Sequence, residues 1–572
     1  MNLKYILTLV CAAIISNSYA QQFLHQEPLN NRPQEKKVTF WDVQKSFENY
    51  WTNAQPSDKE NENAEKGGYQ QYKRWENFMK QRTYPTGEFP NPEILFNEYQ
   101  TYKQNISANK YMQPQAANWT FMGPSVLPGN GGGSGRLNCM AFHPTNNNTI
   151  WVGSACGGLW KTTDGGQTWT SNTDLLPSLS ISDIVIDPTN PQIMYLATGD
   201  KYGIYYQYEV WGHYSAGVLK STDGGLTWNA TGLNYNLANN ALIQRLVIDP
   251  SNTNTLYAAT FNGIFKTTNG GTTWTNIRNG TFYDLELKPG TPATVYASDN
   301  SSFIYSTNGG NTWSNGTGIT AAGRTSIAVS AAAAAGVYLW AEGGGLYYSS
   351  NSGVSFTART APSITVYGYY DMVLEVSQTN ANTLAAGGLD VAISTNGASS
   401  WSTVSNWNSW PATNYVHADH HTLMFLPGSN STLFACNDGG LFKSINTGST
   451  WTDLSNGIHI KQYYRISGSQ QNAQYFLAGA QDNGTDKVTN PTTATRIYGA
   501  DGEDVLIDFT NDQIVFFSYQ GGNWFRSTNG GTTYNSIPAG GAIGHRPSLW
   551  TPQTITHFIL AALMFFGQQI ME

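Results

Sequence analysis

The chain has 572 residues, a net charge of −8 and only 12% charged residues, whereas glycine (58), tyrosine (33) and tryptophan (18) are abundant. Few charges, many aromatic side chains and many turn-forming glycines favour an extracellular all-β protein over a helical cytosolic one. The negative net charge and the lack of any run of lysine or arginine argue against nucleic acid as a partner.

The first twenty residues have the pattern of an export signal. Lys4 precedes the apolar stretch Tyr5–Ile15, and Ala20 ends a segment that suits cleavage. The apolar stretch is too short to span a bilayer. We therefore expect a signal peptide over residues 1–20, cleavage near Ala20, no transmembrane segment, and a secreted or cell-surface protein.

Residues 21–117 differ in composition from the rest of the chain. Two stretches, Phe40–Phe47 and Tyr72–Met79, have the apolar spacing of amphipathic helices, and prolines follow them. We expect a small helical N-terminal extension here.

An eight-residue repeat dominates the region 118–545. Its first copy, Thr162–Trp169, reads TTDGGQTW. Later copies begin at Ser221, Thr267, Ser306, Ser349, Ser394, Ser444 and Ser527. Spacings of about 40–50 residues are typical of four-stranded propeller blades. The longer interval before Ser527 fits two blades, one of which lacks the repeat.

The repeat has the residues that a tight hairpin needs. The Asp or Asn at its third position can accept hydrogen bonds from backbone N–H groups, and the glycines allow a positive φ. The closing aromatic residue can anchor the hairpin between neighbouring blades. We expect an all-β, multi-bladed β-propeller of about nine to ten blades, the last one incomplete.

The repeats resemble the Asp boxes (BNR repeats) of sialidases, family 74 xyloglucanases and sortilin-type (VPS10) propellers. The string Gly153–Lys161 is most similar to bacterial sortilin/family 74-like propellers, which Bacteroidetes often export. This resemblance implies the fold rather than the function, because Asp boxes lie in hairpins remote from catalytic centres. A sialidase would need three converging arginines, and no arginine motif of that family is found.

The segment His417–His421 (HADHH) holds three of the nine histidines. If it forms a strand, His417, Asp419 and His421 share one face and His420 points to the other. Such a set could hold a divalent metal or present a carboxylate-tuned histidine for acid–base chemistry. The alternative is a buried polar network between blades. No cofactor is expected.

Three further polar clusters follow at blade-like intervals: Asn437–Gly440, Gln481–Gly484 and Gly499–Asp504. Loops from different blades converge on the axial mouth of a propeller, so these clusters can meet in one site. The set resembles signatures in later blades of sortilin-like bacterial propellers, although Gly499–Gly502 (GADG) carries one additional residue. Ordinary turns are the alternative, because Asp-Gly and Asn-Gly are common turn formers.

Aromatic residues accompany these clusters. The loop Gly199–Trp211 lengthens the first repeat interval and is rich in tyrosine, and Trp410 lies close to His417. Exposed aromatic rings could stack on sugar rings, or the loop could pack over the adjacent blade.

We interpret the chain as a glycan-directed protein, with glycoside hydrolysis as the candidate activity. Glycosidases require two carboxylates at a fixed separation. The alternatives are a sortilin-like propeller that binds peptide or protein and a non-catalytic adhesion protein. We expect a monomer. The candidate catalytic residues are Asp419, His417, His421, Asp482 and Asp501. The candidate substrate-binding residues are Asp200, Trp211, Trp410, Asp438, Gln481, Asn483 and Asp504.

Residues 546–572 depart from the repeat cadence and contain an apolar run, Phe558–Phe566. If codons compatible with this tail are read in a shifted frame, one of the possible translations resembles the sequence pattern of the first blade. We interpret this tail as a frameshift product, and a divergent terminus that closes the ring is the alternative.

Overall fold

The computed structural model describes residues 38–53, scattered positions between 72 and 104, and residues 121–537 apart from 203–213, 240, 301, 321–322, 369 and 520–522. The expected signal peptide, the tail 546–572 and Trp211 lie outside the described residues. Among the described residues, no helix is both long and apolar enough to cross a membrane.

Strands dominate residues 121–537, where they form nine four-stranded antiparallel sheets, each in the order first to fourth strand. In the first four sheets the strands are β1 Leu137–His143, β2 Asn146–Ser154, β3 Leu159–Thr162, β4 Thr170–Ser171; β5 Ile181–Ile186, β6 Met194–Thr198, β7 Gly217–Ser221, β8 Asn229–Asn234; β9 Ile243–Ile248, β10 Leu256–Thr260, β11 Gly263–Thr267, β12 Thr275–Arg278; and β13 Asp284–Leu287, β14 Val295–Ser298, β15 Phe303–Ser306, β16 Ser314–Asn315.

In the remaining five sheets the strands are β17 Thr325–Val329, β18 Val337–Ala341, β19 Leu346–Ser349, β20 Thr357–Arg359; β21 Val373–Val376, β22 Leu384–Gly387, β23 Val391–Ser394, β24 Ser402–Thr403; β25 His420–Phe425, β26 Leu433–Asn437, β27 Gly440–Ser444, β28 Thr452–Asp453; β29 Tyr463–Gly468, β30 Phe476–Ala480, β31 Gly484–Asn490, β32 Thr493–Tyr498; and β33 Gly502–Ile507, β34 Val515–Tyr519, β35 Asn523–Ser527, β36 Asn535–Ile537. Two short 3-10 turns are present: Leu237–Asn239 lies between the second and third sheets, and Ala331–Ala333 lies between β17 and β18 of the fifth sheet. The predicted all-β propeller is confirmed, and nine sheets fall within the predicted number of blades.

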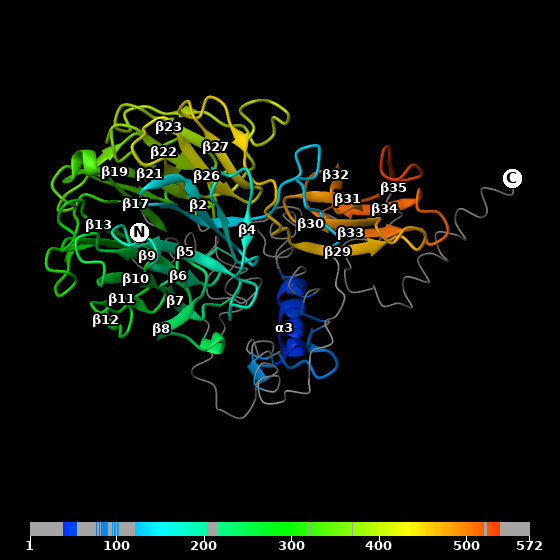
Figure 1. Ribbon diagram of the computed structural model, residues 1–572, viewed down its shortest axis with the longest axis horizontal. Coiled ribbons are helices and arrows are strands. Elements are labelled where there is room, and N and C mark those ends of the chain that lie inside the picture. Colours follow the sequence, from blue (N-terminus) through cyan, green and yellow to red (C-terminus); the bar gives the residue numbers. More distant parts are fainter. Residues whose placement is uncertain are drawn as a thin grey trace, which may run out of the picture. The chain divides into compact units, whose positions relative to one another are not determined.

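The first seven sheets close into a ring (Figure 1). The first strand of each sheet contacts the first strand of the next, and β1 contacts β25, the first strand of the seventh sheet. Thr422 of β25 donates its hydroxyl hydrogen bond to the carbonyl oxygen of Asn138 in β1, at 3.0 Å. Phe434 and Cys436 of the seventh sheet share a buried core with Met140 of the first. The ring is therefore sealed by both polar and apolar contacts.

The eighth and ninth sheets lie outside this ring and beside it (Figure 1). They pack on each other through Leu477, Val505 and Phe517. The seven-sheet closure is a feature that repeat spacing did not reveal, because the long interval between Ser444 and Ser527 shows only that one blade lacks the repeat and not where a ring closes.

The eight repeats occupy the hairpins between the third and fourth strands of their sheets, as Thr162–Trp169 does between β3 and β4. Asp164 accepts hydrogen bonds from the backbone N–H groups of Gln167 and Thr168. Gly165 and Gly166 have φ values of 77° and 96°. The sheet β29–β32 has only a short turn at this place, so the prediction of one blade without the repeat is confirmed.

The helix α3 spans Phe40–Asn53, where the sequence predicts helix. Thr39 and Asp42 cap its start, since the Thr39 hydroxyl donates to the Asp42 carboxylate at 2.7 Å and accepts from the Asp42 N–H at 3.3 Å. Phe47 stacks on Tyr72 with ring centroids 3.6 Å apart. The limits of a helical extension over 21–117 stay a prediction.

Candidate functional site

The loops before the first strand and after the second strand of each sheet lie at the same end of the sheets. In an antiparallel pair the start of the first strand faces the end of the second, as Leu137 faces Ser154 and His420 faces Asn437. Segments that precede a first strand therefore lie near the turns that follow a second strand. The polar residues that precede first strands are Arg136, Tyr370, His417, Asp419 and Asp501, and those that follow second strands are Asp200, Asp438 and Asp482.

Asp438 is a buried carboxylate at this end of the ring. Tyr370 donates its phenolic hydrogen bond to Oδ2 of Asp438 at 2.5 Å, and Nε2 of His421 lies 2.5 Å from Oδ1. Asp438 is only 3% exposed. Both of its oxygens are thus engaged by protein groups.

Arg136 lies behind this carboxylate. Its guanidinium donates to the Tyr370 hydroxyl at 3.1 Å and forms an ion pair with Asp200. Asp200 also accepts a hydrogen bond from Asn138 at 3.2 Å. Asp200 is predicted from the sequence to bind substrate, whereas in the structure its carboxylate contacts protein groups and is buried.

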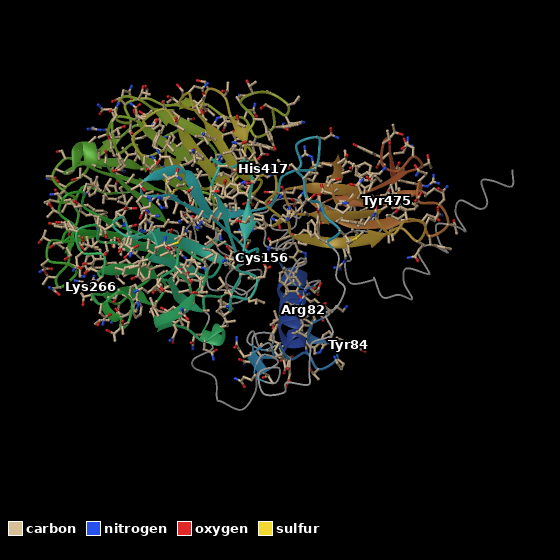
Figure 2. The ribbon with its side chains drawn as sticks, in the orientation of Figure 1. Arg82, Tyr84, Cys156, Lys266, His417 and Tyr475 are labelled. Carbon is tan, nitrogen blue, oxygen red and sulfur yellow. The ribbon has the colours of Figure 1, made fainter. Side chains whose placement is uncertain are left out.

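The eighth sheet contributes the turn Gln481–Gly484 to the same site. Nε2 of His417 lies 3.0 Å from the backbone carbonyl oxygen of Asp482, and the Asn483 amide donates to the carbonyl oxygen of Asp438 at 3.0 Å. Asp501, which precedes the ninth sheet, accepts from the Asp482 N–H at 2.9 Å. Figure 2 shows His417 where the ring meets the sheets β29–β36.

Three carboxylates come together here, since Asp419, Asp438 and Asp482 each offer an oxygen within 4.8 Å of the others. Asp419 and Asp482 are partly exposed, unlike Asp438. Asp419 and Asp482 also adopt positive φ values, 65° and 59°. Aspartate tolerates this left-handed conformation better than most residues, and here it turns the chain sharply at both positions.

The environment shifts the pKa values of these carboxyl groups in opposite directions. Burial raises the pKa of Asp482 well above its ordinary value, and the charges of Asp501, Asp438 and Asp419 add to this. Burial also acts to raise the pKa of Asp438, but the charges and hydrogen bonds of His421 and Arg136 with Tyr370 outweigh it and lower that pKa. The site therefore favours a protonated Asp482 beside an ionised Asp438.

A second buried carboxyl group, Asp371, stands next to Asp419. Burial raises the pKa of Asp371 to about 7, against a hydrogen bond with Asp419 and the charge of Arg324, which both lower it. The backbone N–H of Tyr367 donates to Asp371 at 2.5 Å. Oxygen donors of this kind suit a hard divalent cation, but both oxygens of Asp438 already accept from Tyr370 and His421.

The strand interpretation of His417–His421 is wrong for its first half. β25 begins at His420, so His417 and Asp419 lie in the loop before it. The reason is the positive φ of Asp419, which is incompatible with a regular strand. His420 still faces elsewhere, with Nδ1 2.8 Å from the carbonyl oxygen of Gly388.

The remaining candidate residues have partners outside this cluster. Asp504 pairs with Arg465 at 3.3 Å, and Gln481 accepts a hydrogen bond from the Tyr464 hydroxyl. Trp410 is 50% exposed, and its ring lies 5.3 Å from that of Tyr415.

Three residues of the site, Arg136, Tyr370 and Asp371, are not predicted from the sequence. Arg136 follows the glycine-rich string 131–135, which matches no functional motif. Tyr370 and Asp371 lie before β21, in a segment without any repeated motif. The available signal was their position, since each precedes the first strand of a blade as His417 and Asp419 do.

The fold is that of a β-propeller, and comparison with known proteins places it near the glycoside hydrolases of family 74. No protein-family model matches the chain. A xyloglucanase of Hypocrea jecorina is 28% identical over 163 residues, which is 26% of this chain and 19% of that protein. A xyloglucanase of Acetivibrio thermocellus is 28% identical over 160 residues, 26% of this chain and 18% of that protein. The matched segment thus spans about a fifth of the length of these relatives.

Solved structures show the same fold. The GH74 xyloglucanase from Xanthomonas campestris is 16% identical, covers 71% of this chain with 68% of its own, and has a TM-score of 0.56. An ancestral GH74 enzyme is 16% identical, covers 72% of this chain with 63% of its own, and has a TM-score of 0.54. This chain is similar in fold to family 74 propellers.

Proposed function

We propose that this protein is an exported glycoside hydrolase that acts on an extracellular β-glucan of the xyloglucan type. The observation that carries the proposal is the pair Asp419 and Asp482, two partly exposed carboxyl groups with oxygens within 4.8 Å of each other. Retaining glycosidases hold their two carboxyl groups about 5–5.5 Å apart, and inverting enzymes about 6.5–9.5 Å apart. A separation of at most 4.8 Å is nearer to the retaining value than to the inverting one.

The two carboxyl groups differ in the way that this reaction requires. Asp482, whose pKa is raised by burial and by neighbouring carboxylates, is the general acid that donates its proton to the leaving glycosidic oxygen. The Asp419 carboxylate attacks the anomeric carbon as that bond breaks, which gives a glycosyl ester. Water then cleaves the ester, and the Asp482 carboxylate takes up the proton of that water. Atoms and charges return to the starting state.

Neighbouring groups have supporting roles in this proposal. His417 and Asp501 fix the Asp482 backbone through its carbonyl oxygen and its N–H group. His421 acts through Asp438 rather than on substrate. Trp410, half exposed, offers an aromatic face on which a sugar ring can stack.

Capture of a peptide, as in sortilin-type Asp-box propellers, is the second candidate. An apolar tunnel would favour it. The inner strands of this ring instead carry charged groups, since Arg245 of β9 lies 2.6 Å from Glu286 and 3.6 Å from Asp183. We therefore prefer the glycan.

The test is a hydrolysis assay on xyloglucan and a panel of other β-glucans, with reducing ends as the readout. Asp482→Asn and Asp419→Asn should each lower kcat by at least 1000-fold, and Asp223→Asn, in a repeat hairpin, should leave it unchanged. NMR of the first-formed product should show retention at the anomeric carbon. Absence of hydrolysis across the panel, or full activity in Asp482→Asn, would overturn the proposal.

A further inference from the structure

The most unusual contact set at the site belongs to a carboxylate that substrate cannot reach. Asp438 is 3% exposed, and its two oxygens are bonded to Tyr370 and His421 at 2.5 Å each. A nucleophile or base needs a free lone pair that points at the substrate. Asp438 therefore has another task.

The direction of the hydrogen bonds at Tyr370 is fixed by chemistry. A guanidinium can only donate, so the 3.1 Å contact from Arg136 makes the Tyr370 oxygen an acceptor. The phenolic proton of Tyr370 is donated to Oδ2 of Asp438. Because arginine stays protonated in proteins, this arrangement always presents a donor to Asp438.

We propose that Arg136 and Tyr370 are positioning residues that lock Asp438 as a permanent anion beside Asp482. This inference rests on the proposed function, in which Asp482 is the acid. The Asp438 and Asp482 carboxyl oxygens lie within 4.8 Å of each other. A fixed negative charge on Asp438 at this distance disfavours ionisation of Asp482, so Asp482 stays protonated at the pH where glycan is cleaved. The shifted pKa values of Asp438 and Asp482 agree with this geometry.

Several other titratable and charged groups face this pair and contribute to its titration. Asp501 and Asp419 raise the pKa of Asp482 after burial, and the ion pair of Arg136 with Asp200 supplies the cation behind Tyr370. Among the described residues, the titratable and charged groups around the two carboxyl groups include Arg136, Asp200, Tyr370, Asp371, His417, Asp419, His420, His421 and Asp501.

Asp438→Asn is the decisive variant. The amide that it introduces can accept from Tyr370 through its oxygen and donate to His421, whose Nδ1 has no hydrogen-bond partner among the described residues and can take up the proton. The charge disappears while the contacts are kept. We expect the alkaline limb of the kcat/KM pH profile to move to lower pH by at least one unit, with activity at acidic pH retained within tenfold.

Tyr370→Phe should behave differently. It keeps the ring that packs edge-on against His421, with centroids 4.9 Å apart, but removes the donor. Asp438 then competes with Asp482 for the proton of the hydrogen bond between their side chains. We therefore expect kcat to fall at least tenfold while the alkaline limb does not move to lower pH. A merely structural role would give both variants the same loss and no movement of the limb.

A second readout needs no turnover. A carboxyl group whose pKa is raised on folding lowers stability as pH rises from its unfolded pKa, about 3.9, toward its folded pKa. Wild type should therefore lose stability relative to Asp482→Asn as pH rises above about 4, in urea unfolding. In the Asp438→Asn background this relative loss should become smaller.

The two readouts separate the two proposals. If no glycan is hydrolysed but the unfolding difference responds to Asp438→Asn, the function fails and the positioning role stands. If glycan is hydrolysed but neither the alkaline limb nor the unfolding difference responds, the positioning role of Arg136 and Tyr370 is overturned.

Discussion

Nε2 of His417 lies 3.0 Å from the backbone carbonyl oxygen of Asp482, and the two residues belong to different parts of the fold. His417 precedes β25 in the seventh sheet of the ring, and Asp482 is in the turn between β30 and β31 of the eighth sheet. Burial lowers the pKa of His417, so a neutral ring donates through Nε2. This contact holds the Asp482 turn against the ring.

His417→Ala should therefore reduce turnover more than stability. Loss of one buried hydrogen bond costs about 1–2 kcal/mol of unfolding free energy. The displaced Asp482 should lower kcat by at least tenfold, because catalytic groups must be placed accurately. Steady-state kinetics and urea unfolding measure the two effects. His143→Ala, at the opposite end of β1, is the control, and equal turnover in both variants would contradict the expectation.

The repeat hairpins should be structural. Asp223 accepts hydrogen bonds from the N–H groups of Leu226 and Thr227 and from the Thr227 hydroxyl. Asp223→Ala should lower the Tm because all three are lost. Asp223→Asn should be tolerated, since Asn269 makes the same backbone contact and donates to the Thr273 hydroxyl instead.

The pH dependence of this hairpin follows from the same contacts. Hydrogen bonds from the Thr227 side chain and backbone and from Ser221 lower the pKa of Asp223 to about 2. The contribution of Asp223 to stability is present above its unfolded pKa and is lost as pH falls toward about 2. Calorimetry of wild type and Asp223→Asn between pH 5 and pH 2 measures it, and an equal pH response in the two proteins would contradict the assignment.

The seam of the ring should be the place where core truncation is most disruptive. Phe434 is 1% exposed and meets Phe142 edge-on, with ring centroids 5.1 Å apart. Phe434→Ala should lower the free energy of unfolding by about 3–5 kcal/mol. Ile445→Ala, at a residue that is 68% exposed, should change it by less than about 0.5 kcal/mol. Urea unfolding compares them, and similar midpoints would show that Phe434 does not support the seam.

His420 should give the protein a sensitivity to acid. Burial lowers its pKa to about 4, well below the usual value near 6.5. A histidine that stays neutral when folded costs stability as pH falls from about 6.5 to about 4, by about 3 kcal/mol for this shift. His420→Asn, whose amide can replace Nδ1 as donor to Gly388, should lose this dependence. Urea unfolding at pH 7 and pH 4.5 measures it, and an unchanged difference would place the sensitivity elsewhere.

Local chemistry explains why the strands and hairpins could be predicted. The hairpin of Asp164 with Gly165 and Gly166 is determined by a few neighbouring residues, and it recurs with the same residue types. The sequence predicts that His417, Asp438 and Asp482 lie at the same end of the blades. The distances between them could not be predicted, because they depend on how the sheets pack against one another.

Other features of the site depend on contacts between distant residues that leave no local pattern. The closure of the ring requires Thr422 to find Asn138, 284 positions earlier. The ionised state of Asp438 depends on Tyr370 and Arg136, which come from two other blades. Asp419 lies in a loop and not in the predicted strand, because its positive φ interrupts the extended backbone that a strand requires.

The segment just before β1 pairs with the last strand of the eighth sheet. Gly129 donates to the carbonyl oxygen of Ala494 at 3.1 Å and accepts from Arg496 at 3.0 Å, and Ser125 donates to Pro491 at 2.7 Å. During synthesis, residue 125 leaves the ribosome 366 positions before its partner. At about 5–20 residues per second this is a wait of about 20–70 s. Over that time the backbone groups of this segment have no strand to pair with, although the whole ring can already have closed. The eighth sheet therefore pairs with a segment that was made long before it, and a holding chaperone would be most useful to the chain in this interval.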